Sequence, residues 1–469
     1  MMNSRINEYF KIYEEGEFLS KSKVHWFGPR GALSTVVKGQ RLFELASLND
    51  CFSKWDTVAI KIHCGEWNNT GYLRPSIVTG IVETVKDYGG DPFVCDTTSM
   101  YGGARTIAQD MYKVAARNGF TSATLGCPFI VADGDMGTDD VKVGVDGNYL
   151  NHTYIAKAIA NADAMIVLTH FKGHPSGIFG GAMKNVGIGC CSKRGKSVTH
   201  LVKHPRYGLP RYSFKPELCK GTDCSIYKSC SESCPTEAFQ IVDEKPYARL
   251  DLDKCSGCLG YISKMGCGVL SVDQDELKEM GQSFPATIPD SVKAVINHLG
   301  REHVGFINYA IDISPWCDCM TFTDSYILPN LGVYASKDIV SIDKACLDAA
   351  DRTEGVPGSR AFDEERENEP WKAGHEKFTY IPCSHRFKEI SQWIQINAAV
   401  NIGLGSIYYE LVEATPGPPE KYVMPKFREH SWGYIFNRRF KDDVPMPDLD
   451  CFKKKPKISI EELTKKPKF

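Results

Sequence analysis

The sequence lacks the features that mark several common protein classes. No apolar run approaches the roughly 18–20 residues of a membrane-spanning helix, and the opening segment, MMNSRINEYFKIYEEGEF, is too polar and acidic for a secretory signal. The 56 Lys and Arg residues nearly balance the 58 Asp and Glu residues, which gives no electrostatic reason to expect nucleic-acid binding. We therefore expect a soluble, cytoplasmic protein that binds neither membranes nor nucleic acid.

Strands and helices are predicted to alternate along the first 200 residues. Apolar, β-branched runs predict strands, and apolar residues at helical spacing predict helices. The expected strands are 57–63, 91–99, 163–171 and 304–314, the expected helices are 76–89, 152–162 and 291–300, and 337–352 reads as a strand followed by a helix. This order predicts an α/β fold with a mostly parallel sheet flanked by helices.

Changes in composition divide the chain into four parts. Residues 20–213 and 276–400 are expected to form one α/β domain, interrupted by a small, ferredoxin-like cysteine-rich insert at 214–275. Residues 401–469 form a proline-rich and basic C-terminal extension with seven lysines between 453 and 469. The extension reads either as an arm that contacts the protein surface or a second copy of the chain, or as a solvated tail.

The cysteines are distributed unevenly. Seven of the 18 lie within 49 residues, namely Cys219, Cys224, Cys230, Cys234, Cys255, Cys258 and Cys267. Cytosolic thiols are kept reduced, so a disulfide framework is not expected. Structural buried cysteines would be scattered along the chain, so this local group predicts a metal or cluster site.

The insert matches a bacterial ferredoxin pattern, C-x2-C-x2-C-x3-C-P, with alterations. In the first half, Cys224, Cys230 and Cys234 keep the register, and Tyr227 takes the second position. In the second half, Tyr261 and Met265 take the third and fourth positions.

Because the fourth cysteine of one motif ligates the other cluster, we expect one [4Fe-4S] cluster held by Cys234, Cys255, Cys258 and Cys267. The other three, Cys219, Cys224 and Cys230, supply only three ligands. A second cluster at these residues would take its fourth ligand from elsewhere in the chain or would contain three irons. Zinc at these thiolates and an insert without metal are the alternatives.

Three segments at expected strand ends are dense in reactive groups, and open α/β sheets bind ligands at such ends. The candidates are Lys61, His63, Glu66, Asn69, Thr70 and Arg74 in the first segment, His170, Lys172, His174, Lys184, Asn185, Cys190 and Cys191 in the second, and Asp312, Cys317, Asp318, Cys319 and Asp324 in the third. Each also has an ordinary structural interpretation, as a satisfied histidine, a solvated loop charge or a buried thiol.

Glycines favour a functional interpretation of the second segment. Gly173, Gly177, Gly180, Gly181, Gly187 and Gly189 allow a backbone to approach an anion closely, although neither a dinucleotide fingerprint nor a phosphate-loop spacing is present. The catalytic residues we expect are His63, Lys172, His174, Lys184, Cys317 and Cys319. The lysines would anchor a small anionic substrate, the histidines, with His170 as a further candidate, would transfer protons, and the C-x-C pair would serve as a redox dithiol or a metal site.

These segments, together with DTTSMYGGAR at 96–105 and LPNLGVYASKDIVSIDKACLD, resemble the bacterial and archaeal family catalogued as domain of unknown function 362, in its form with a ferredoxin insert. The resemblance covers roughly residues 20–360. It implies an iron–sulfur protein of anaerobic or facultative metabolism but no established reaction. The matching positions are His63, Gly65, Glu66, His170, Lys172, Gly173, His174, Lys184, Asn185, Cys190, Cys317, Asp318 and Cys319.

We therefore expect an iron–sulfur oxidoreductase whose cluster relays electrons from an electron-donor protein to a small anionic substrate. One alternative is an electron-transfer or metallocentre-assembly protein without its own substrate. Another is a lyase or isomerase whose cluster is structural or acts as a Lewis acid. Convergence of the three segments on one pocket would distinguish an enzyme from a protein that only transfers electrons.

Overall fold

The computed structural model describes residues 21–31, 33–201, 213–232, 234, 236–255, 267–271, 274–363, 368–381 and 390–415. Within these ranges, none of the helices combines the length and the apolar character needed to cross a membrane.

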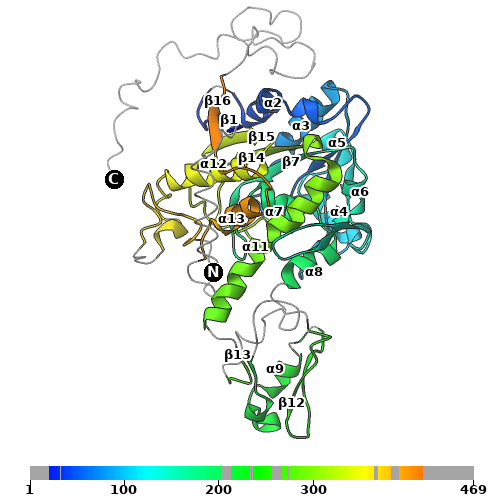
Figure 1. Cartoon of the computed structure of the whole chain (residues 1–469), viewed down its shortest axis with the longest axis vertical. Helices are drawn as coiled ribbons and strands as arrows, with labels where there is room; N and C mark the ends of the chain where they lie inside the picture. Colours follow the sequence, from blue (N-terminus) through cyan, green and yellow to red (C-terminus); the bar gives the residue numbers. More distant parts are fainter. Residues whose placement is uncertain are drawn as a thin grey trace, which may run out of the picture. The chain divides into compact units, whose positions relative to one another are not determined.

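An eight-stranded sheet is the main structural element, with the order β16–β1–β15–β14–β7–β2–β3–β4 (Figure 1). The strands are β1 (Ser22–Phe27), β2 (Thr57–Lys61), β3 (Asp91–Asp96), β4 (Phe129–Val131), β7 (Ala164–His170), β14 (Val304–Ala310), β15 (Gly332–Ser336) and β16 (Tyr409–Glu413). Neighbours pair in parallel except at β15, which is antiparallel to β1 and β14. The predicted α/β fold with a mostly parallel sheet is confirmed.

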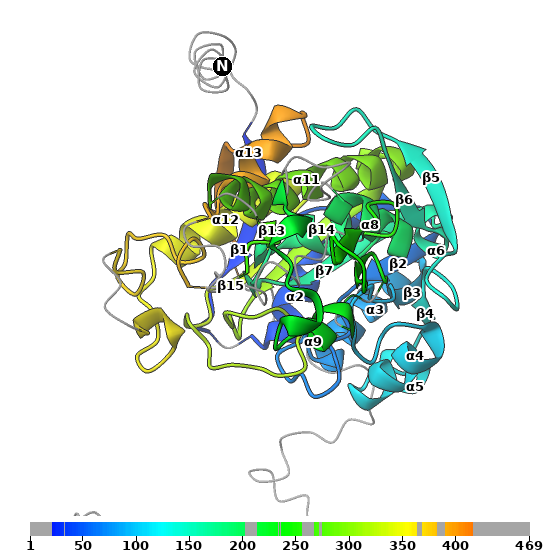
Figure 2. The ribbon, with the colours of Figure 1, turned by 90° about the horizontal axis from the view of Figure 1, so that it is seen from below.

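Helices cover both faces of this sheet (Figures 1 and 2). The helices α2 (Thr35–Leu45), α3 (Pro75–Asp87) and α4 (Ala108–Arg117) pack on one face, and α7 (Ala182–Gly187), α11 (Gln274–Leu299), α12 (Ile339–Asp351) and α13 (Ile394–Asn401) pack on the other. Strand β2 shows the division, since Val58 and Ile60 belong to the first core and Ala59 to the second. Successive side chains of a strand point to opposite faces, so one buried strand supports both cores.

Local sequence explains where these helices begin. Proline at the first position of α3 has a fixed φ suited to a helix start and lacks the N–H that would have no partner there. The side chain of Asp338 accepts hydrogen bonds from the backbone N–H groups of Val340 and Ser341 and so caps α12. The buried residues of α3 recur at helical spacing and face the sheet.

Two element predictions were wrong. Residues 152–162, predicted as one helix, form β6 (His152–Ala156) and the short α6 (Lys157–Ala160), because β6 pairs with β5 (Asp140–Gly144). The start of 337–352 was predicted as a strand, but the strand β15 ends before it, at Ser336, and α12 begins at Ile339. A short apolar run can form either a strand or a helix. Pairing with β5 makes residues 152–156 a strand, and the Asp338 cap makes the residues that follow it a helix.

The described part of the insert consists of short elements. These are β10 (Ser213–Phe214), η2 (Pro216–Leu218), η3 (Gly221–Asp223), α9 (Tyr227–Glu232), β11 (Phe239–Ile241), β12 (Ala248–Leu250) and β13 (Leu270–Ser271). Antiparallel pairing of β10 with β13 brings the two ends of the insert together, and β11 pairs with β12. Phe239 is buried against Cys230 in a small apolar cluster.

The remaining elements are α5 (Ser122–Leu125), β8 (Lys172–His174), β9 (Ile178–Gly180), α8 (Lys193–Leu201), η1 (Leu48–Cys51), η4 (Arg301–His303) and η5 (Arg360–Phe362). Within the extension predicted at 401–469, residues 409–413 form the edge strand β16 beside β1. The sequence pattern did not predict this strand. The proline-rich and lysine-rich remainder, from residue 416, lies outside the described residues.

Candidate functional site

The three candidate segments converge at one edge of the sheet. The first follows β2, the second follows β7, the third follows β14, and residues after β3 join them. The chain winds outward from β2 to β3 and β4, and in the opposite direction from β7 to β14, so the strand order reverses between β2 and β7. Open α/β sheets hold their ligands at such a reversal.

A cavity of about 380 Å³ lies at this edge. Side chains lining it include His63, Glu66, Asp96, Thr97, Thr98, Tyr101, Arg105, Thr169, His170, Lys172, His174, Lys184, Asn185, Lys196, His200 and Cys319. Ionisable groups of both signs therefore share one cavity, and the largely buried groups among them interact more strongly than they would in water.

Lys61 and Asp96 form the buried link between β2 and β3. The Lys61 ammonium lies 3.0 Å from Asp96 Oδ1 and donates to Asn185 Oδ1 at 2.9 Å. Burial alone would raise the pKa of Asp96, but the charge of Lys61 and then those of His63 and Arg105 hold it well below its usual value. Lys61 is fully buried beneath the cavity, so it positions Asn185 and Asp96.

Arg105 connects this pair to Glu66. Its Nε atom lies 3.1 Å from Glu66 Oε2, and its Nη1 atom lies 3.8 Å from Asp96 Oδ2. Both residues of the Arg105–Glu66 pair are buried. Sequence reasoning selected Glu66 but missed Arg105, although Arg105 ends the polar strand-end segment DTTSMYGGAR.

Asp318 organises the second and third segments. Its carboxylate accepts a hydrogen bond from Lys172 at 2.8 Å and lies 2.9 Å from His170 Nδ1. The other ring nitrogen of His170 lies 2.9 Å from the carbonyl oxygen of Ile311. Both nitrogens of His170 are therefore engaged within the protein, so His170 positions Asp318 and has no nitrogen left for a substrate proton.

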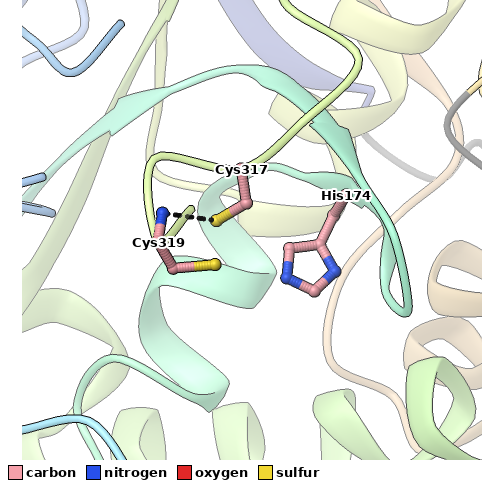
Figure 3. Close-up of side chains that lie close together, drawn as sticks. All are labelled: His174, Cys317 and Cys319. Atoms are coloured by element: carbon pink, nitrogen blue, oxygen red, sulfur yellow. Dashed lines mark hydrogen bonds between the residues drawn. The ribbon is translucent and has the colours of Figure 1, made fainter. Parts of the chain in front are cut away.

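The cysteines of the C-x-C pair lie beside His174 (Figure 3). One ligand atom from each of His174, Cys317 and Cys319 falls within 4.8 Å of the others, close enough for a single metal ion, and this is the one such group among the described residues. The backbone N–H of Cys319 donates to Cys317 Sγ at 3.4 Å, and Lys184 Nζ donates to the same sulfur at 3.8 Å. Cys317 is 1% exposed, whereas Cys319 lines the cavity.

These donors set the charge of the pair. A hydrogen bond from Cys319 lowers the pKa of Cys317 well below its usual value, and Lys184 and His174 lower it further against the effect of burial. The pKa of Cys319, the donor, is raised well above the usual value. Cys317 therefore gives up its proton more readily than an isolated buried thiol would.

Backbone groups fix the tautomer of two cavity histidines, His174 and His63. Nδ1 of His174 accepts hydrogen bonds from the N–H groups of Ser176 at 3.1 Å and Gly177 at 2.7 Å. Nδ1 of His63 accepts the N–H of Gly65 at 3.0 Å. Burial lowers the pKa of His174 to about 4, and burial with the charge of Arg105 lowers that of His63 to about 3. Both rings are thus neutral at pH 7, with the proton on Nε2 available as a donor.

The glycines of the second segment pack closely against other parts of the protein. A Cβ atom at Gly173 would lie 2.5 Å from the carbonyl oxygen of Pro315, and one at Gly181 would lie 2.4 Å from Asp343 Oδ1. Gly180, Gly181 and Gly189 also line the cavity. Gly173 therefore allows the C-x-C loop to approach β8. Gly181 allows the carboxylate of Asp343, which accepts the N–H groups of Ala182 and Met183, to approach the start of α7.

Lys196 is a second cavity residue that sequence reasoning did not select. Its ammonium donates to Thr97 Oγ1 at 2.7 Å and to the carbonyl oxygens of Thr98 and Cys191 at 2.8 and 2.7 Å. Burial among these neutral acceptors lowers its pKa to about 8. The local sequence SKRGK offered no signal that separates this lysine from solvated ones.

Other predicted residues have structural contacts. Asn69 donates to the carbonyl oxygens of Met320 and Phe322, Thr70 bonds Thr323, Arg74 pairs with Asp312 at 2.7 Å, and Asp324 pairs with Arg360 at 2.8 Å. Cys190 and Cys191 are buried beneath the site, and burial raises the pKa of Cys190 to about 12. These residues hold the loops that carry the site.

Six of the seven insert cysteines fall in the described residues, and Cys258 lies outside them. Burial raises the pKa of Cys230, and the nearby thiols of Cys224, Cys267 and Cys219 raise it further. Cys219 and Cys234 pack against the apolar cluster around Cys230. Cys230, in the first half of the insert, therefore lies near Cys267.

Comparisons with known proteins identify a family. The model described as "Domain of unknown function (DUF362)" matches residues 58–348. The thylakoid-associated protein sll1697 of Synechocystis is 25% identical over 162 residues, which are 34% of this chain and 46% of that protein, so the match spans about half of that relative. The lactate racemase apoprotein of Thermoanaerobacterium thermosaccharolyticum aligns over 62% of this chain and 51% of its own, at 13% identity and a TM-score of 0.32.

Proposed function

Since the chain belongs to the DUF362 family, whose description gives no activity, we propose a function from the site itself. The protein is an iron–sulfur oxidoreductase that binds a small anionic substrate in the strand-end cavity. The carrying observation is the convergence of three chain segments on that one cavity, with cationic side chains and a thiol pair at its wall. An electron-transfer protein without a substrate would need no such cavity.

The charges around the cavity favour an anion. Four cationic side chains line it, Lys172, Lys184, Lys196 and Arg105, against the carboxylates of Glu66 and Asp96. Lys184 donates to Cys317 Sγ and so stabilises negative charge on the thiol pair, whereas Lys196 donates to neutral oxygen atoms, which leaves its charge for an anion. The Nε2–H group of His63 adds a neutral donor suited to carboxylate or phosphate oxygens.

The insert supplies a thiol set that fits an iron–sulfur cluster. The thiols of Cys219, Cys224 and Cys267 lie near enough to Cys230 to raise its pKa, and a set of four thiolates suits a cubane cluster. On this basis we assign Cys267 to the same cluster as Cys230, whereas the crossing rule led us to expect it with Cys234, Cys255 and Cys258. When bound, such a cluster transfers single electrons.

The test begins with protein purified without oxygen. Iron, acid-labile sulfide and zinc are measured per chain, and the protein is then reduced with dithionite. Small carboxylates and phosphates that can accept electrons are added one at a time, and reoxidation is followed by absorbance and electron paramagnetic resonance. We expect sulfide to match iron and at least one anion to reoxidise the protein.

Matched variants connect that result to the cavity. Lys184→Met is expected to raise the KM for the active anion at least about tenfold, the effect of losing one charged contact of about 1.4 kcal/mol or more. Lys157→Met, at an exposed position of α6, is expected to leave the KM unchanged. Zinc without sulfide, or reoxidation that is indifferent to every anion, would overturn the proposal.

A further inference from the structure

We propose that Cys319 and Cys317 form a redox-active dithiol that reduces a small disulfide carrying carboxylate groups, with Cys319 as the attacking thiol and Cys317 as the resolving thiol. This proposal rests on the proposed function, because it names the substrate class of the same cavity. It assigns different tasks to two cysteines that the sequence presents as equivalent.

Exposure distinguishes the two tasks. Cys319 lines the cavity, so a bound molecule can reach its sulfur, whereas Cys317 is 1% exposed and lies behind it. Cys317 Sγ receives the backbone N–H of Cys319 and the ammonium of Lys184, which stabilise a negative charge on that atom. The hydrogen bond between the two thiols gives Cys319 a path along which its proton can pass to Cys317 when a substrate approaches.

The orientation of His174 favours thiol chemistry over a metal ion. Two backbone N–H groups donate to Nδ1, so the neutral ring carries its proton on Nε2, the nitrogen on the side of the sulfur atoms (Figure 3). Metal-bound histidines instead donate their second N–H to an acceptor, which leaves the facing nitrogen free for the metal. Here the facing nitrogen is a donor to the thiolate.

The reaction balances with the disulfide as oxidant. Cys319 passes its proton to Cys317, and the Cys319 thiolate attacks one sulfur of the substrate, which forms a mixed disulfide and releases one thiolate. That thiolate takes the proton of Cys317, and Cys317 then attacks Cys319 Sγ and releases the second thiolate. One substrate disulfide is reduced, one Cys317–Cys319 disulfide forms, and two electrons and one proton from the electron-donor partner restore the pair.

The presence of two thiols and nearby cations selects the substrate class. A carbon electrophile would need only one thiol, whereas a mixed disulfide needs a second thiol within reach to release it. Lys184 contacts the thiolate and also lines the cavity, so it can hold a substrate carboxylate near the sulfur atoms. The ligand is therefore an anionic disulfide.

Stoichiometric exchange on the full-length reduced protein tests this without turnover. Dithiodiglycolate, a small dianionic disulfide, is mixed with the protein, and released thiol and protein disulfides are measured by mass spectrometry. The wild type is expected to release two thiols per chain and to form the Cys317–Cys319 disulfide. Its rate is expected to exceed that with dicationic cystamine at least about tenfold, and Lys184→Met is expected to reduce this preference.

Single variants separate the two roles. Cys317→Ser is expected to stop at a mixed disulfide on Cys319 after one thiol is released, Cys319→Ser to release none, and Cys346→Ser, a buried cysteine elsewhere, to react as the wild type. The wild-type disulfide map stands as a result even if a variant does not fold. Absence of the intramolecular disulfide would overturn the inference, as would a stoichiometric metal ion that both variants lose and that blocks exchange.

The outcomes also separate the inference from the proposed function. Exchange depends on the thiol pair and on the cavity beside it, whereas reoxidation of the dithionite-reduced protein depends on the metal insert. Reoxidation by an anion that persists in Cys317→Ser would overturn the dithiol role and leave the oxidoreductase. Thiol exchange by a protein that contains zinc without sulfide would support the dithiol role and overturn the iron–sulfur oxidoreductase.

Discussion

The ammonium of Lys172 lies 2.8 Å from the carboxylate of Asp318, and neither side chain is more than 6% exposed. This ion pair joins β8 to the loop after β14, whose neighbouring residues Cys317 and Cys319 lie on either side of Asp318. His170 contacts the same carboxylate from the end of β7. Asp318 is therefore the residue through which the sheet positions the thiol pair.

Removal of this carboxylate should be strongly destabilising. Asp318→Ala leaves Lys172 buried without its partner, which costs about 3–5 kcal/mol of unfolding free energy. Because the positive charges of His170 and Lys172 hold the pKa of Asp318 below its usual value despite burial, the contribution is present above about pH 4 and is lost as the pH falls further. Urea unfolding at pH 7 and pH 3 measures both effects.

Asp324→Ala is the matched control for this measurement. Its ion pair with Arg360 is about one-third exposed on each side, and partly exposed pairs contribute at most about 1 kcal/mol. Equal losses for the two variants would show that burial of the Lys172–Asp318 pair has no special weight.

Asp343 should make the fold less stable as the pH rises from 4 to 6. Its carboxylate accepts the N–H groups of Ala182 and Met183 and the amide of Asn308, but burial outweighs these bonds and raises its pKa to about 6 from 3.8. Between these values the unfolded chain has already lost the proton that the folded state retains, so unfolding free energy falls, by up to about 3 kcal/mol.

Asp343→Asn is expected to flatten that part of the pH profile, as measured by urea unfolding in steps of half a pH unit. Asp87→Asn, at an exposed position of α3, should keep the wild-type profile. An unchanged slope in Asp343→Asn would mean that another carboxylate, such as Asp351, whose pKa burial raises to about 7, dominates this range.

Cys267 should share its metal with the first half of the insert. Cys219→Ser and Cys267→Ser are each expected to lower the iron content by about four atoms per chain, and the double variant should lose no more than either one. Cys51→Ser, a core position outside the insert, should keep the full content. If the double variant instead loses the sum of the iron lost by the two single variants, Cys267 and Cys219 bind different clusters.

Gly173→Ala should disturb the C-x-C loop. A methyl group at this position would lie 2.5 Å from the carbonyl oxygen of Pro315, so β8 and the loop must separate, at about 1–3 kcal/mol for overpacking. Gly144→Ala, whose added methyl group would lie 3.9 Å from the carbonyl oxygen of Asn151, should be nearly neutral. Thermal unfolding compares the two, and a neutral Gly173→Ala would show that the loop yields freely.

The sequence by itself determined the α/β fold, since hydrophobic runs such as 57–63 and 76–89 carry their own periodicity, and it determined which residues could perform chemistry. Tertiary structure alone decided how those residues are used. Lys61 and Lys184 look alike in sequence, but one is buried against Asp96 and the other faces a sulfur atom. Arg105, Lys196 and the edge strand β16 were missed because their partners lie far away along the chain. Charge state and exposure depend on those distant partners, which local patterns do not encode.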